Sequence, residues 1–172
     1  MKKIGLISDT HGYLDPRILT LFANCDEVWH AGDIGSMDVL RQLQAFKPLR
    51  AVYGNIDDAE MRYTLNEIER FEVEGVDVLL MHIGGHPGKY SAKALITLAS
   101  NPPKLMACGH SHILRVIYDK KYQCLHINPG ASGMFGFHTV RTALRFVIDN
   151  GEIKDMEIIE LGNRAQENII AK

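Results

Sequence analysis

Short apolar runs alternate with amphipathic segments in the first half of the chain. The runs are typical of buried strands and cover residues 2–8, 27–30 and 49–53. Asp15 followed by Pro16 predicts the start of a helix that ends near residue 24, and Ser36 predicts the cap of a second helix over residues 37–46. Strands that alternate with helices in this way predict a parallel sheet.

The second half is dominated by strand patterns. Residues 68–74 alternate apolar and charged side chains, Gly75 supplies a turn and residues 76–81 form an apolar run, which together predict a hairpin. A helix is predicted over residues 91–100, and strands follow over 104–108, 114–119, 122–128, 139–148 and 153–160. We therefore expect one α/β domain over residues 1–172. It is a two-sheet β-sandwich, with a mostly parallel first sheet and a mostly antiparallel second sheet, flanked by helices. Residues 161–172 form a tail to which the pattern assigns no structure.

The composition is that of an ordinary globular protein, with 46% hydrophobic and 23% charged residues. The net charge of -2 gives no support for binding nucleic acid, which usually needs a basic face. The three cysteines form no CxxC pair, so we expect reduced thiols. The first apolar run is too short for a signal sequence or a membrane span, and a cytoplasmic protein without a membrane partner is expected.

Side chains that can bind metals follow five of the predicted strands. They are Asp9, His11, Asp33, Asn55, His82, His110 and His112. Because the carboxyl ends of parallel strands meet at one edge of a sheet, we expect these side chains to converge. Nearby glycines, such as Gly54 and Gly109, allow the backbone to pass close to the site.

The donor set favours two cations. Carboxylate and imidazole donors without thiolates suit manganese, iron, zinc or nickel. Seven donors would crowd one ion, whereas two ions that share a carboxylate and a water would use them all. Such pairs recur in enzymes that displace an ester at phosphorus, where they turn the bridging water into hydroxide. The sequence therefore predicts a metal-dependent phosphoesterase.

The order D-x-H, G-D, G-N, H and G-H-x-H resembles the signature of the calcineurin-like metallophosphoesterase superfamily. The chain length, the G-N-x-D form at residues 54–57 and the turn at residues 128–130 are similar to its short bacterial and archaeal phosphodiesterase branch. The resemblance implies a metallo-dependent phosphatase-like sandwich with two divalent ions, manganese above all. It implies one ion on Asp9, His11 and His112, a second on Asn55, His82 and His110, and Asp33 as the bridge.

Three positions depart from that signature. Ile56 stands where many members carry a histidine that protonates the leaving group. Residues 82–86 read H-I-G-G-H in place of a tighter H-G-H, which makes His86 a candidate ligand or proton donor. Ala131 stands where the branch tends to place serine.

Further candidates lie outside the ligand set. We predict Asp33, Asn55 and His86 as catalytic residues. Asp57 is a candidate substrate-binding residue that could hold a ligand histidine or a metal-bound water, with a solvated or helix-capping role as the alternative. Arg141 is a candidate phosphate contact, with a structural role as the alternative. His30 either orients a ligand or packs in the sheet. His126 and His138 are assigned structural roles.

The preferred hypothesis is a phosphodiesterase that acts on a small phosphate ester. The first alternative is a non-catalytic interaction scaffold of the same fold, because one eukaryotic coat-complex subunit resembles it. The second is a nuclease on small nucleic-acid substrates. The loops over residues 84–90 and 130–138 are expected to set substrate specificity. A homodimer or higher homo-oligomer is expected because symmetric association is common.

Overall fold

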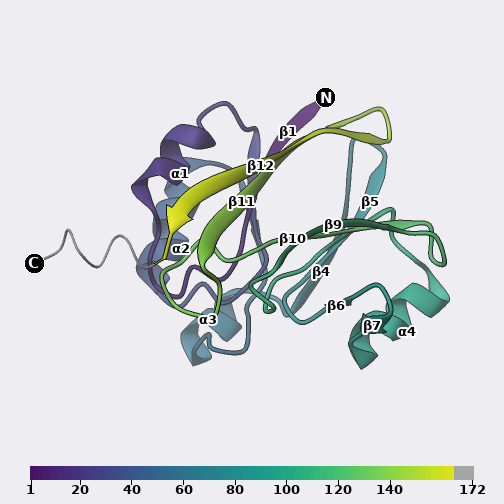
Figure 1. Cartoon of the computed structure of the whole chain (residues 1–172), viewed down its shortest axis with the longest axis horizontal. Helices are drawn as coiled ribbons and strands as arrows, with labels where there is room; N and C mark the ends of the chain where they lie inside the picture. The colour runs from purple at the N-terminus through teal and green to yellow at the C-terminus, as the bar shows by residue number, and fades with distance from the viewer. Residues whose placement is uncertain (165–172) are drawn as a thin grey trace, which may run out of the picture.

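The computed structural model describes residues 1–164, which form a sandwich of two five-stranded sheets (Figure 1). The first sheet has the order β12-β11-β1-β2-β3. Its strands are β1 (Lys2–Ile7), β2 (Glu27–His30), β3 (Leu49–Ala51), β11 (Val140–Asp149) and β12 (Glu152–Asn163). The part of the predicted tail beyond Arg164 lies outside the described residues.

The second sheet has the order β4-β5-β8-β10-β9. Its strands are β4 (Ile68–Val73), β5 (Val76–Met81), β8 (Leu105–Ala107), β9 (Leu114–Asp119) and β10 (Cys124–Pro129). A two-stranded ribbon, β6 (Gly85–His86) with β7 (Lys89–Tyr90), follows β5. This ribbon was not predicted, because two residues are too few to produce a strand pattern.

The predicted two-sheet α/β sandwich is confirmed, with a different balance of strand directions. In the first sheet β1, β2 and β3 are parallel, whereas β11 and β12 are antiparallel neighbours. In the second sheet β5, β8 and β10 are parallel, and β4 and β9 are antiparallel edge strands. Each sheet therefore has equal numbers of parallel and antiparallel pairings. Three of the four antiparallel pairings in these two sheets are hairpins, β4–β5, β9–β10 and β11–β12, since only antiparallel neighbours can be joined by a tight turn.

The described residues form four helices, which lie outside the sheets. They are α1 (Pro16–Leu21), α2 (Met37–Phe46), α3 (Ala59–Thr64) and α4 (Ala92–Ser100). The predicted caps are confirmed, because the Asp15 and Ser36 side chains accept hydrogen bonds from the first turns of α1 and α2. Helix α3 was not predicted. It begins at the Asp58 cap and is six residues long, which is too short for a clear periodic pattern.

The core has three apolar layers. Between the sheets, the Trp29 ring packs edge-to-face on Phe71 and Phe146 at centroid distances of 5.1 and 5.6 Å. Residues of α1 and α2 pack on the outer face of the first sheet, and α4 packs on the outer face of the second. The three cysteines are buried in these layers as unpaired thiols, as predicted. No helix within residues 1–164 has the length and apolar composition that a membrane crossing requires.

Candidate metal centre

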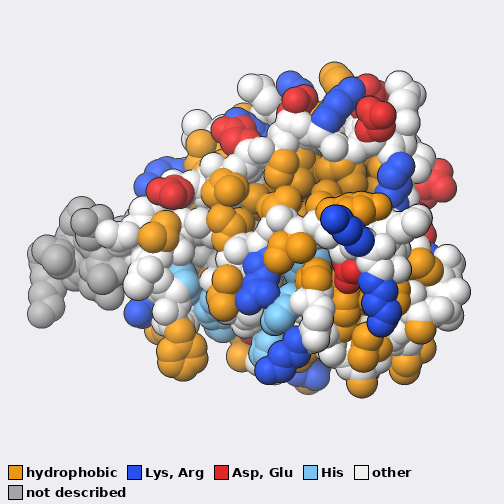
Figure 2. Space-filling model, turned by 45° about the vertical axis from the view of Figure 1, so that its right-hand side comes forward, with side chains coloured by type: hydrophobic (Ala, Val, Ile, Leu, Met, Phe, Trp, Pro, Cys, Tyr) orange, Lys and Arg blue, Asp and Glu red, His pale blue; other side chains and the backbone are white. Residues whose placement is uncertain are grey.

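The loops after five parallel strands bring the predicted ligands together. These loops follow β1, β2, β3, β5 and β8, whose carboxyl ends reach one edge of the sandwich. Within residues 1–164, two groups have ligand atoms that lie within 4.8 Å of one another. The groups are Asp9, His11 and His112, and Asp33, His82 and His110. Figure 2 shows histidine side chains at the surface of one face, with Lys and Arg side chains nearby.

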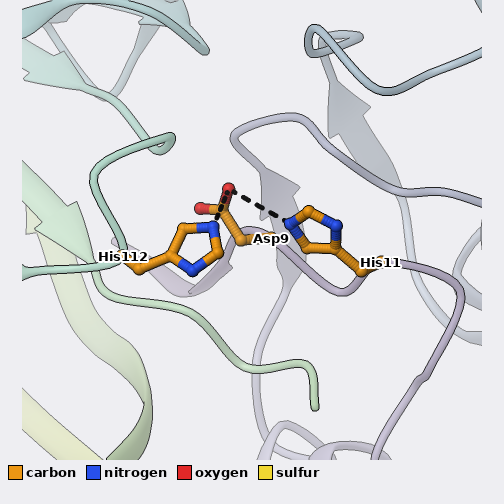
Figure 3. A group of neighbouring side chains, drawn as sticks. All are labelled: Asp9, His11 and His112. Carbon is orange, nitrogen blue, oxygen red and sulfur yellow. Dashed lines mark ion pairs between the residues drawn. The ribbon is translucent and has the colours of Figure 1, made fainter. Parts of the chain in front are cut away.

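The first group surrounds one oxygen of Asp9 (Figure 3). Asp9 Oδ1 lies 3.2 Å from His112 Nε2 and 3.9 Å from His11 Nε2. Both imidazoles point toward this oxygen from separate loops. The other oxygen, Asp9 Oδ2, accepts a hydrogen bond from the His110 backbone N–H at 3.1 Å. Asp9 is therefore held by the backbone on one side and faces two imidazole nitrogens on the other.

Asp33 lies between the two groups. Its Oδ2 is 3.2 Å from His82 Nε2 and 3.7 Å from His11 Nε2, a residue of the first group. Its Oδ1 accepts a hydrogen bond from Ile56 N at 3.0 Å. Asn55 Oδ1 lies 3.2 Å from His82 Nε2, so Asn55 adds an amide oxygen to the second group. A single Asp33 oxygen thus faces imidazoles of both groups, which is the position of a shared ligand.

The tautomer of His82 supports a cation at this point. Its Nδ1 is 2.7 Å from the Ala31 carbonyl oxygen, so Nδ1 carries the proton and donates it. In the neutral ring, Nε2 then carries a lone pair, and this lone pair faces the acceptor oxygens of Asp33 and Asn55. Three acceptors in contact need a positive charge between them. Although burial opposes protonation, the carboxylates of Asp33 and Asp9 raise the pKa of His82, so a proton and a cation compete for this lone pair.

Two buried atoms of the first group also lack a partner. Asp9 Oδ1 and His11 Nε2 are buried and make no hydrogen bond within the described part of the chain. Buried polar atoms in folded proteins are almost always hydrogen-bonded, so unpaired acceptors indicate a missing ion or water. Burial and the neighbouring His82 also lower the pKa of His110, which keeps its imidazole in the neutral form that binds metals. The residues present therefore fit a pair of divalent cations.

The backbone of the ligands is strained. Asp9, His11, Asp33, His110 and His112 have φ angles of 48–68°. This left-handed region costs roughly 1–2 kcal/mol for a residue other than glycine. Backbone hydrogen bonds between the loops stabilise these conformations: Asp9 N donates to Gly32 O, and His11 N donates to Asp33 O, both at 3.0 Å. Strain that clusters on the candidate ligands is typical of a functional site.

Glycines beside the ligands leave no room for a side chain, as predicted. A Cβ atom at Gly54 would lie 2.0 Å from Asp33 Oδ1, and one at Gly109 would lie 2.0 Å from Ser8 Oγ and 2.9 Å from Asp9 Oδ2. A Cβ atom at Gly32 would lie 2.6 Å from the His82 ring. These backbones therefore press directly on the ligand side chains.

His30 joins the loops after β1 and β2. Its Nδ1 accepts a hydrogen bond from Gly32 N at 3.2 Å, and its Nε2 lies 3.0 Å from Thr10 Oγ1. Full burial lowers the pKa of His30 to about 3, so the ring is neutral and can accept and donate at the same time. His30 contacts the backbone next to Asp33 and not a ligand side chain.

His138, for which the sequence predicts a structural role, contacts a candidate ligand. Its Nε2 is 3.0 Å from the Gly133 carbonyl oxygen and its Nδ1 is 3.2 Å from His112 Nδ1. Nε2 therefore carries the His138 proton, and His112 Nδ1–H donates to His138 Nδ1. This arrangement leaves the His112 Nε2 lone pair directed at the metal centre. The only signal in the sequence was a histidine in a glycine-containing loop.

We expect His138→Ala to weaken metal binding by about 10- to 100-fold, because His112 loses the partner that sets its tautomer and ring orientation. Calorimetric titration of the metal-free protein with Mn²⁺ measures this change. The matched control is His86→Ala, which should leave the affinity unchanged because His86 belongs to neither ligand group. Equal affinities for wild type and His138→Ala would show that His138 does not orient His112.

Asp57 has a different role from substrate contact. Its carboxylate accepts backbone hydrogen bonds from Gly35 N at 2.7 Å, Gly54 N at 2.8 Å and Ile34 N at 3.2 Å. Only 4% of the residue is exposed. Because both oxygens are occupied by backbone donors, Asp57 holds together the loops that carry Asp33 and Asn55. Neither substrate binding nor helix capping describes this role, since Asp58 caps α3.

Arg141 also lies away from the metal centre, which agrees with the alternative prediction that its role is structural. The residue is fully buried, and its guanidinium contacts Asp15 Oδ2 at 2.9 Å and the Leu161 carbonyl oxygen at 2.7 Å. Although burial opposes ionisation, hydrogen bonds from Arg17 and Arg141 lower the pKa of Asp15 to about 2. Arg141 therefore ties α1 to the last strand and cannot reach a phosphate.

His86 stands apart from the ligand groups. It lies on β6, and its Nδ1 is 2.9 Å from the Pro87 carbonyl oxygen. It does not line the shallow pocket of about 240 Å³ over the metal centre. Ile56 and Phe137 do line this pocket together with His11, Asp33 and His110. Among residues 1–164, no contact supports His86 as a ligand or proton donor.

A two-sheet sandwich that gathers Asp, Asn and His ligands for a pair of cations defines the class of the metallophosphoesterases. Residues 1–151 match the family described as the calcineurin-like phosphoesterase superfamily domain. The chain belongs to this superfamily.

Named relatives agree with this family. The chain is 29% identical over 169 residues to a probable metallophosphoesterase of Methanothermobacter thermautotrophicus, with 92% of each chain covered. Its fold is similar to that of an archaeal phosphodiesterase, with a TM-score of 0.73 and 21% identity over 91% of this chain and 99% of the other. It is also similar to Vps29 of Entamoeba histolytica in complex with zinc, with a TM-score of 0.67 and 18% identity over 92% and 98% of the two chains.

Proposed function

We propose that this protein is a metal-dependent phosphodiesterase that hydrolyses small phosphate esters. The observation that carries the proposal is the position of Asp33 Oδ2, which faces His82 at 3.2 Å and His11 at 3.7 Å beside two buried polar atoms that make no hydrogen bond within the described residues. A shared carboxylate between two imidazole groups suits in-line displacement at phosphorus. Membership of the superfamily supports the same reaction class.

Each candidate ligand would have a defined role in such a reaction. Asp9, His11 and His112 would hold one cation, Asn55, His82 and His110 the other, and Asp33 both. When bound, divalent cations would lower the pKa of a coordinated water toward neutrality and would offset the charge of the phosphate oxygens. In hydrolysis the water oxygen forms a bond to phosphorus, the ester P–O bond breaks and the alcohol leaves with a proton.

Ile56 favours esters with good leaving groups. Its side chain is 45% exposed, lines the pocket over the metal centre and has no proton to donate. Within that pocket, the polar side chains are the candidate ligands and Ser111. An alkoxide leaving group needs a general acid, whereas an aryl oxide leaves without one. We therefore favour activated diesters over alkyl monoesters as substrates.

Metal removal tests the proposed function. Protein stripped of metal should lose at least about 100-fold of its activity on bis(p-nitrophenyl) phosphate, and Mn²⁺ should restore it. The assay measures p-nitrophenolate release, and elemental analysis of the purified protein measures the metal carried before stripping. Manganese is our first choice, with nickel, iron and zinc as alternatives, because this donor set accepts each of them. Unchanged activity in demonstrably metal-free protein would refute the proposal.

The similarity to Vps29 favours one other candidate, a non-catalytic scaffold of the same fold. A scaffold has no need for lone pairs aimed at a common point, and here the whole ligand set is present. Two measurements together distinguish the enzyme from the scaffold: calorimetry measures metal binding, and the esterase assay measures turnover. Metal binding without turnover on any phosphate ester would favour the scaffold.

A further inference from the structure

A second cavity lies beside the metal centre, and most of the residues that line it belong to neither ligand group. Its volume is about 330 Å³, near the lower end of the range for small-molecule sites. It is formed by the loop after β3, helix α3, the end of β5 and the start of α4. Asn55 and His82 line it, so the cavity is continuous with the second ligand group.

The walls of this cavity are largely apolar. Tyr53, Met81 and Ile83 supply an aromatic ring, a thioether and a branched aliphatic side chain, and Ala92 adds a methyl group from the first turn of α4. Ile83 is 44% exposed although it is apolar. Such walls suit a flat hydrocarbon group, since both methionine and aromatic side chains pack well against rings. A bare phosphate would make no use of them.

Arg62 is the cationic group that the fold holds firmly in this cavity. Its Nε donates to the Asp57 carbonyl oxygen at 2.7 Å, and Nη2 donates to the Asn55 carbonyl oxygen at 3.0 Å. The guanidinium lies over the Tyr53 ring at 5.1 Å. Within residues 1–164, no hydrogen bond uses Nη1. A rigid guanidinium with open N–H groups stacks on aromatic rings and donates to an oxygen acceptor. Lys93 is the other cation that lines the cavity, and it is paired with Glu67.

We propose that this cavity binds an aromatic ester group of the substrate, so that the preferred substrates are aryl phosphodiesters with an oxygen acceptor on the ring. The group would extend from a phosphate at the metal centre past Asn55 and His82 toward Arg62. This inference rests on the proposed phosphodiesterase function. The cavity would explain why the protein prefers one diester to another, because the metal ligands by themselves do not determine which ester groups are accepted.

Two esters with the same leaving group test the inference. The Mn²⁺-loaded protein is assayed with bis(p-nitrophenyl) phosphate and with methyl p-nitrophenyl phosphate, and the ratio of their kcat/KM values is compared between wild type and Ala92→Phe. The added ring enters the cavity from the first turn of α4, and position 92 belongs to neither ligand group. We expect this ratio to fall about tenfold or more in the variant while the methyl ester rate changes little. The control is Ala99→Phe, an exposed position of α4 outside the cavity, which should retain the wild-type ratio.

A binding measurement separates failure of this inference from failure of the proposed function. Calorimetry of the Mn²⁺-loaded wild type should give an affinity for phenylphosphonate about tenfold or more above that for methylphosphonate, whether or not the protein turns over any ester. Equal affinities would overturn the inference even if the protein hydrolyses diesters. A preserved ester ratio in folded Ala92→Phe would also overturn it. Tight phenylphosphonate binding without turnover would support the cavity and count against the phosphodiesterase.

Discussion

Asp33→Asn should lower kcat/KM on bis(p-nitrophenyl) phosphate by roughly a thousandfold, because an amide cannot supply the negative charge that two cations share. The substitution is nearly isosteric. The amide oxygen of the variant side chain can still accept the Ile56 N hydrogen bond that the Asp33 carboxylate accepts at 3.0 Å. The expected loss therefore comes from charge and not from packing.

The control for Asp33→Asn is Asp38→Asn on α2, whose carboxylate is 83% exposed and pairs only with Arg41 at 3.3 Å among the described residues. This variant should keep full activity. Thermal unfolding of the metal-free proteins completes the comparison: although burial opposes ionisation, the contact with His82 lowers the pKa of Asp33, so Asp33→Asn removes a favourable charge and should lower the Tm while the protein remains folded. Activity of Asp33→Asn within tenfold of wild type would exclude a bridging role.

Gly54→Ala should reduce activity by about 100-fold without changing any ligand. A Cβ atom at this position would lie 2.0 Å from Asp33 Oδ1 and 2.4 Å from the Asp33 backbone N. Because one of these atoms belongs to the backbone, a side-chain rotation cannot relieve the contact. The Asp33 loop must move, and displacements of about 1 Å in a catalytic site can cost about 100-fold in rate. Overpacking should also lower the stability by roughly 1–3 kcal/mol.

The matched control for Gly54→Ala is Gly162→Ala on β12. Gly162 has a φ of +85° and open space around its Cα, so alanine there adds backbone strain but no collision. It should lose some stability and retain activity. Activity assays, metal stoichiometry by elemental analysis and thermal unfolding are measured on all three proteins. Gly54→Ala with full activity and wild-type metal content would mean that the loop adapts and that the close approach is not required.

Local patterns in the chain were sufficient to predict most elements. Apolar runs, the Asp15 and Ser36 caps and the hairpin turn at Gly75 depend on neighbouring residues, and the structure has each of them. The seven candidate ligands were also visible, because each follows the end of a strand. The structure brings them together as predicted. The roles of Asp33 and Asn55 in catalysis stay predictions.

Partners distant in the chain were not visible in the same way. His138 contacts His112 across 26 residues, and Arg141 pairs with Asp15 across 126. The residues adjacent to His138 and Arg141 in the sequence do not indicate which distant residue each one contacts. Arg141 therefore resembled a phosphate contact and His138 a structural histidine. The supporting role of Asp57 was hidden for the same reason. Two of its three backbone donors lie in the loop after β2, more than 20 residues earlier in the chain.

The sequence by itself determined which side chains are available and at which strand ends they stand, because strand, cap and turn signals act between neighbours. Only the tertiary structure decided which of these side chains meet, which nitrogen of each imidazole is left without a proton, and which charged groups are buried as supports. Those outcomes depend on contacts between loops and on left-handed backbone angles at Asp9, Asp33 and His110. Packing of the whole sandwich maintains such angles, whereas a local preference would not.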